Sequence, residues 1–94
     1  MTQRQTEQLR WAVLRYLAER QGLSFDADQI AAGIATNRML DFRADAEAVA
    51  AAVVFVAGLG WVVRCHDAAG ATLYARASSE GVLTWERRRM EIGL

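Results

Sequence analysis

The stretch AVAAAVVFVAGLGWVV, from Ala48 to Val63, contains no charged residue, and it limits the folds open to this chain more than any other feature. A membrane-spanning helix needs about 20 predominantly apolar residues. This run has 16, and charged residues border it on both sides. We therefore expect the run to belong to a water-soluble core and not to span a membrane.

The composition of the run changes halfway along it. Its first part, within ADAEAVAAAVVFVAG, is rich in alanine, the best helix former, and the acidic residues at its start suit the helix dipole. The second part, LGWVVRC, is β-branched and aromatic. These patterns predict a helix from about Ala44 to Ala57 and a strand from about Trp61, with Gly58 or Gly60 ending the helix.

The N-terminal half predicts two further helices. Apolar residues at helical spacing indicate a first helix over residues 3–20, with Gly22 as a stop signal. Asp26 and Gln29 have the spacing of a capping box, which predicts a short second helix over residues 26–35.

The C-terminal part predicts a hairpin and a last helix. The strand over residues 61–66 turns at DAAG, a sequence typical of a tight turn, and returns over residues 72–76. Ser78 or Ser79 then caps a helix over residues 80–92. A two-stranded hairpin is marginally stable alone, so we expect it to pack against the helices in one α+β domain of residues 1–94.

The overall composition indicates the class of protein and the compartment in which it works. The hydrophobic content of 53% is enough for one core. A single cysteine forms no internal disulfide, and the polar start does not resemble a secretory signal, so we expect a cytoplasmic protein. Eleven arginines balance eleven acidic residues, which removes any global attraction to nucleic acid or to an anionic membrane.

Three segments, AVAAAVVFVAGLGWV, FDADQIAAGI and LYARASSEGVLTWE, together resemble the winged-helix branch of the helix-turn-helix superfamily, which includes MarR-, PadR- and ArsR-type bacterial regulators. The layout is also similar to small winged-helix proteins of Mu-like prophages. The positions that carry the likeness are Val49, Val53, Val56 and Gly60, then Ile30, then Tyr74, Ser78, Glu80 and Gly81. The resemblance implies a three-helix core, a two-stranded β-hairpin wing and a C-terminal helix.

In this superfamily the third helix usually enters the major groove of DNA. The positions expected to face outward here carry no basic residue; they are Glu47, Ala48, Ala51, Val54 and Phe55. Contacts to double-stranded DNA would therefore fall to other residues, namely Asn37, Arg38, Arg43, Arg64, Arg76, Arg87, Arg88 and Arg89. Alternatively, these arginines are solvated or pair with nearby acids, and the arginine triplet complements the dipole of the last helix.

An exposed pair, Val54 and Phe55, has a different explanation, because leftover apolar surface often marks a partner interface. Trp11 and Trp85 would add to it, and the resemblance implies a homodimer formed through the first and last helices. Alternatively, the loop sequence RMLDF covers Phe55.

Catalysis and metal binding are not expected. Cys65 and His66 are neighbours, so on a strand their side chains point to opposite faces and do not converge on a metal or form a catalytic pair. We expect Cys65 to be a small buried residue. The GLG sequence follows a helix where a nucleotide-binding loop would precede one, and no cofactor or small-molecule substrate is indicated.

Two functional hypotheses follow. The first is a winged-helix DNA-binding protein, a small bacterial or phage transcriptional regulator that acts as a dimer. The second is a winged-helix module that binds protein and not DNA. The sequence names neither the operator, the effector, the partner nor the oligomeric state.

Overall fold

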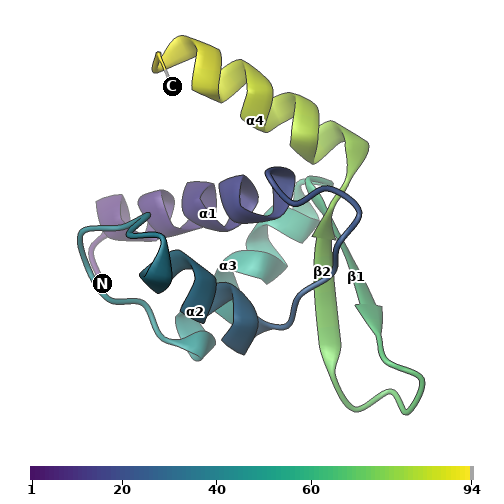
Figure 1. The fold of residues 1–94 in the computed structure, drawn as a ribbon. Helices are drawn as coiled ribbons and strands as arrows, with labels where there is room; N and C mark the ends of the chain where they lie inside the picture. Colours follow the sequence, from purple (N-terminus) through teal and green to yellow (C-terminus); the bar gives the residue numbers. More distant parts are fainter. Residues whose placement is uncertain (94) are drawn as a thin grey trace.

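The computed structural model describes residues 1–93. Its elements in chain order are α1 (Gln3–Ala18), α2 (Ala27–Thr36), α3 (Ala46–Gly58), β1 (Val62–His66), β2 (Leu73–Ala77) and α4 (Ser79–Glu91). Helices α1, α2 and α3 pack around one another, the hairpin lies along one side of them, and α4 lies over α1 (Figure 1). The expected order of helix, helix, helix, hairpin and helix is confirmed.

The uncharged run breaks at its glycines, as expected. Helix α3 ends at Gly58, and Gly60 takes a left-handed φ of +81° that turns the chain into β1. The start of α3 was placed two residues too early, because Asp45 is the N-cap and accepts a 2.8 Å hydrogen bond from the Ala48 N–H. No helix within residues 1–93 is long and apolar enough to cross a membrane.

The two N-terminal helices are also set by local signals. Asp26 accepts from the Gln29 N–H at 2.8 Å, and the Gln29 side chain accepts from the Asp26 N–H at 3.0 Å, so the capping box of α2 is confirmed. Helix α1 ends at Ala18, two residues before the expected end, and Gly22 follows with a φ of +82°.

The strands pair antiparallel, from Val62 opposite Ala77 to His66 opposite Leu73. The expected turn is confirmed, since the Gly70 N–H donates to the Asp67 carbonyl at 2.9 Å. Phe25, between α1 and α2, adds a bridge to the free edge of β2 through two 2.9 Å hydrogen bonds with Ala75. No sequence pattern predicts this bridge, because a single residue has no periodicity.

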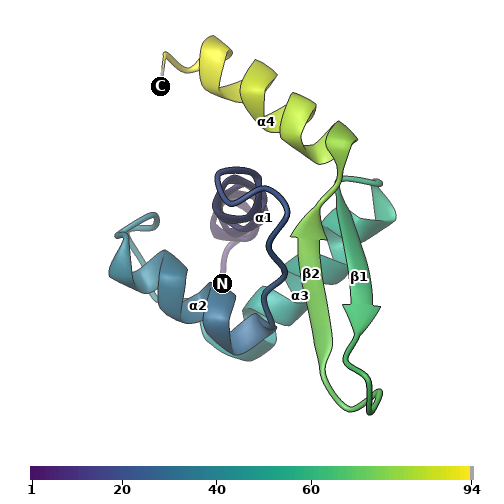
Figure 2. The ribbon, with the colours of Figure 1, turned by 45° about the vertical axis from the view of Figure 1, so that its right-hand side comes forward.

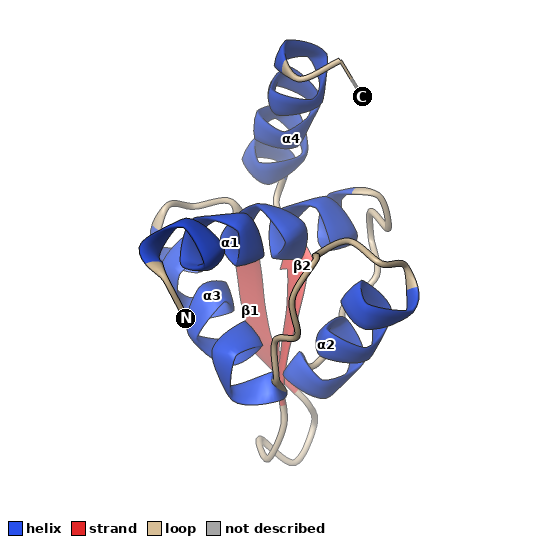
Figure 3. Ribbon diagram, turned by 90° about the vertical axis from the view of Figure 1, so that its left-hand side faces the viewer, coloured by secondary structure: helices blue, strands red, loops and turns tan. Residues whose placement is uncertain are grey.

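The core joins the inward stripes of the first three helices. Its fully buried side chains are Leu9, Val13, Leu14, Leu17, Ile30, Val49 and Val56. Helix α4 is attached to this core near its N-terminal end, where Gly81 and Trp85 are buried. Its C-terminal end lies away from the other elements (Figures 2 and 3).

The expectation that Cys65 is buried is wrong, because its side chain is exposed. Only Val62 is buried among the β1 residues. Cys65 is three residues from the buried Val62, so its side chain points to the opposite face of β1, away from the core.

Candidate interaction surface

The solvent-facing side of α3 forms the most distinctive surface of the molecule. Val49, Ala52, Val53 and Val56 turn inward. The helical period therefore leaves two rows outside, each with residues four apart. We call these rows the α3 face; its residues are Glu47, Ala50, Ala51, Val54, Phe55 and Gly58, all exposed.

This face is apolar over nearly its whole length. Val54 is 52% exposed and Phe55 is 44% exposed, and Glu47 at one end is the only member with a polar side chain. The outward orientation expected for Glu47, Ala51, Val54 and Phe55 is confirmed. Ala48, also expected outside, is half-buried and packs against the core.

Phe55 is held by α1. The guanidinium of Arg10 lies 3.5 Å from the ring centroid, a cation–π contact, and the Arg10 Nε is buried with no hydrogen-bond partner among the described residues. The RMLDF loop does not cover this ring, since Met39, Leu40 and Phe42 pack against the core and the ring stays 44% exposed.

The hairpin extends the α3 face at its C-terminal end. Arg64, His66 and Leu73 share one face of the hairpin and, with Ala57 of α3, line a hollow of about 430 Å³. Leu73 also lines a small apolar pocket of about 110 Å³ with residues of α3 that include Val54. Arg64 therefore lies beside the C-terminal end of α3, whereas His66, which pairs with Leu73, lies beside the middle of the helix.

The other predicted wing residue, Arg76, lies elsewhere. It pairs with Val63, one position from Arg64, so its side chain points to the opposite face of the hairpin. At the turn, hydrogen bonding from the Ala71 N–H lowers the pKa of the Asp67 carboxyl, so Asp67 places a negative charge at this end of the hairpin. Arg64 and Arg76 do not form one basic edge.

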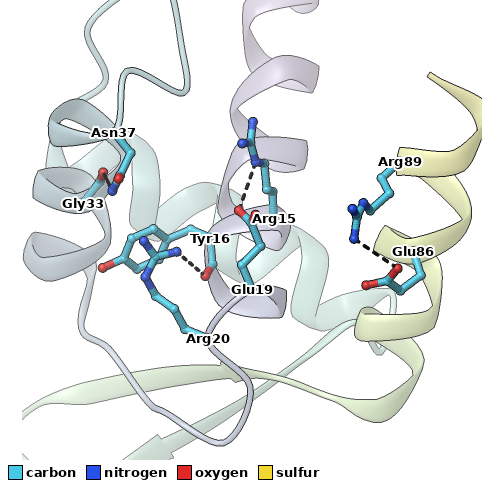
Figure 4. Close-up of polar contacts among 8 residues, drawn as sticks. All are labelled: Arg15, Tyr16, Glu19, Arg20, Gly33, Asn37, Glu86 and Arg89. Carbon is cyan, nitrogen blue, oxygen red and sulfur yellow. Dashed lines mark hydrogen bonds and ion pairs between the residues drawn. The ribbon is translucent and has the colours of Figure 1, made fainter. Parts of the chain in front are cut away.

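The loop between α2 and α3 holds three of the predicted DNA contacts. The Asn37 side-chain amide donates to the Gly33 carbonyl at 2.7 Å and so ends α2 (Figure 4). Arg38 follows with a φ of +51° and is exposed. Arg43 is also exposed and lines a pocket that includes Ala46 at the start of α3.

The arginine triplet is spread around α4. Arg87 is exposed, Arg88 stacks over Trp11 with its guanidinium carbon 4.6 Å from the ring centroid, and Arg89 pairs with Glu86 at 3.6 Å (Figure 4). Consecutive helical residues point about 100° apart, so the three do not share one face.

The two tryptophans predicted at the partner interface face inward. Trp85 is 5% exposed, and the guanidinium of Arg15 lies 5.9 Å from its ring. Trp11 is half-buried and stacks on Trp61 with 5.2 Å between ring centroids. The expectation that Trp85 enlarges the exposed patch is wrong, because this indole attaches α4 to the core.

Residues 1–93 contain no group of three or more His, Cys, Asp or Glu side chains placed to hold a metal ion. Cys65 and His66 lie on opposite faces of β1, since their partners Tyr74 and Leu73 are consecutive. Comparison with protein-family models, with curated proteins and with solved structures found no match to this chain.

Three residues of this surface were missed from the sequence. Ala50 and Gly58 lie four residues before and after Val54, so their exposure follows from the helical period alone. Arg10 has no such signal, because its contact with Phe55 depends on how α1 packs against α3.

Proposed function

We propose that this chain is a winged-helix domain that acts as a protein-interaction module, with the α3 face as its docking surface. The order of elements supports the fold assignment. Phe25 bridges to β2 from between α1 and α2, and the β1–β2 hairpin follows α3. This is the arrangement of three helices and a wing that the sequence resemblance implies.

The observation that carries the proposed function is the chemistry of the α3 face. A helix that reads base edges needs donors and acceptors such as Arg, Asn or Gln on its outer side. Here the outer side offers alanine, valine, phenylalanine and glycine, and its one charge is the negative Glu47. Burying such a surface against another apolar surface is favourable, because it removes apolar area from water. The Glu47 carboxylate repels phosphate at one end of the face.

Photo-crosslinking tests this proposal directly. A photoreactive amino acid at position 51, in the middle of the α3 face, should yield protein adducts in cells that express the chain. The same probe at position 32, exposed on α2, is the control and should yield few adducts. Nucleic-acid adducts at position 51 would contradict the proposal.

A second candidate is a bacterial or phage transcriptional regulator that binds double-stranded DNA through phosphates, as a cytoplasmic homodimer. One observation favours it: exposed arginines lie at both ends of α3, with Arg43 near Ala46 and Arg64 near Ala57. Its test is the binding of a labelled duplex at two salt concentrations. Several phosphate contacts predict a steep loss of affinity with salt, and Arg64→Ala should weaken binding.

A further inference from the structure

We propose that the α3 face binds the α3 face of a second copy of this chain, with the two helices antiparallel about a twofold axis. This inference rests on the proposed function and names its partner. The axis would run between the two helices, at right angles to both, level with the midpoint between positions 52 and 53. In a twofold interface each contact occurs twice, so the face must be complementary to itself.

The sizes of the side chains on the α3 face meet this requirement. About such an axis each row faces the same row of the other copy, so Ala51 of one copy lies next to Phe55 of the other, and Ala50 lies next to Val54. Each large side chain therefore meets a small one, which is the alternation that lets two packed surfaces interdigitate. A parallel pair would instead place Phe55 against Val54 of the other copy and leave the alanines facing each other.

The charges meet the same requirement. Glu47 lies about 8 Å from the axis at the helical rise of 1.5 Å per residue, and its opposite position is Gly58. Arg64 lies beside that end of α3, in the hollow that includes Ala57. The antiparallel pair thus brings the one carboxylate of each face toward Arg64 of the other copy, and it does so at both ends. A parallel pair would place the two Glu47 carboxylates together.

The Phe55 side chain is already ordered in the monomer. The Arg10 guanidinium lies over one side of the ring at 3.5 Å, and this contact restrains the ring before a partner arrives. A side chain that is already ordered loses less entropy on association. The residue that faces it, Ala51, has the smallest side chain that carries a Cβ, which leaves room for the ring.

Sedimentation equilibrium of the purified full chain, from micromolar to millimolar concentration, tests the pairing. The wild type should form a dimer. Ala51→Glu should weaken it by at least about 30-fold, because the substitution buries two unpaired carboxylates near the axis. Position 51 is exposed and glutamate is a good helix former, so circular dichroism should show an unchanged monomer fold.

Met90→Glu is the matched control, since Met90 is 80% exposed on α4. It should leave the dimer unchanged. If Met90→Glu dissociates the dimer and Ala51→Glu does not, the copies associate through α4 and the inference is overturned.

Charge reversal tests the antiparallel direction. Glu47→Arg and Arg64→Glu should each weaken the dimer by roughly tenfold, because each change replaces two attractive pairs by two repulsive ones. The double variant should recover most of the lost affinity. Additive losses in the double variant would overturn the antiparallel arrangement.

The two proposals fail in different ways. A chain that stays monomeric at millimolar concentration overturns the second-copy partner but leaves docking of another protein at α3 in place. Salt-sensitive duplex binding that requires Arg43 and Arg64 contradicts the interaction module itself.

Discussion

Helices α3 and α4 have 13 residues each and opposite chemistry. Helix α3 has one charged residue, Glu47, whereas α4 has six. Helix α3 packs against α1, α2 and β1, and the core buries four of its residues. Helix α4 packs on α1 and β2 and buries only Gly81 and Trp85. The charged helix is therefore attached at a few points, while the apolar helix has more apolar surface than the core can cover.

The largest expected effect tests the attachment of α4. Trp85→Ala should lower the free energy of unfolding by about 3–5 kcal/mol, because it leaves a cavity at the centre of the α1–α4 contact. Urea denaturation measures this loss. The control is Leu83→Ala on the exposed side of α4, where Leu83 is 55% exposed and the change should be within about 0.5 kcal/mol. Equal losses would mean that Trp85 is not the main anchor.

The next prediction compares one glycine from each helix. A Cβ on Gly81 would overlap the Trp61 carbonyl, so Gly81→Ala should lower the free energy of unfolding by about 1–3 kcal/mol. A Cβ on Gly58 meets nothing within 4 Å, so Gly58→Ala in α3 should raise it by about 0.5–1 kcal/mol. Thermal unfolding of both variants gives the two signs, and the same sign for both would contradict the described packing of α4.

Removing the N-cap of α3 or of α4 should lower the free energy of unfolding by more similar amounts than the two glycine substitutions change it. Asp45 makes one capping bond in α3, at 2.8 Å. Ser78 accepts from the Gly81 N–H at 3.0 Å and also donates to the Gly60 carbonyl at 2.6 Å. Both alanine variants should lose about 0.5–2 kcal/mol in urea denaturation, with Ser78→Ala the larger loss. Ser78→Thr, which keeps the hydroxyl, should recover most of it.

The smallest effect concerns the exposed side of α3. Phe55→Leu removes the Arg10 cation–π contact and should lower the free energy of unfolding of the monomer by about 0.5–1 kcal/mol. The measurement is made at a protein concentration that keeps the chain monomeric. Arg10→Met should show a similar loss, and the double variant should lose no more than either single variant. Additive losses would show that the two side chains do not interact.

Local signals in the sequence predicted most of the elements. The capping box of α2, the Ser78 cap, the turn at DAAG and the break of the apolar run near Gly60 were all correct, because each depends on residues within a few positions of one another. Errors at the helix ends were small. Helix α3 begins at Ala46, two residues later than predicted, because the Asp45 side chain is its N-cap.

The candidate site was predicted only in part. The exposure of Val54 and Phe55 followed from the period of the helix. The burial of Trp85 and the exposure of Cys65 did not, since an indole or a thiol has the same local pattern in either place. Arg64 and Arg76 were both predicted to contact DNA from the wing, and the hairpin register places them on opposite faces.

The sequence by itself determined, to within two residues, where each helix and strand begins, and it determined which stripe of each helix is most apolar, because backbone hydrogen bonding and caps act over short distances. Only the tertiary structure decided which apolar surface stays uncovered. That outcome depends on which elements pack against each helix. Helix α3 has apolar side chains on all sides, but α1, α2 and the hairpin cover only its inward side.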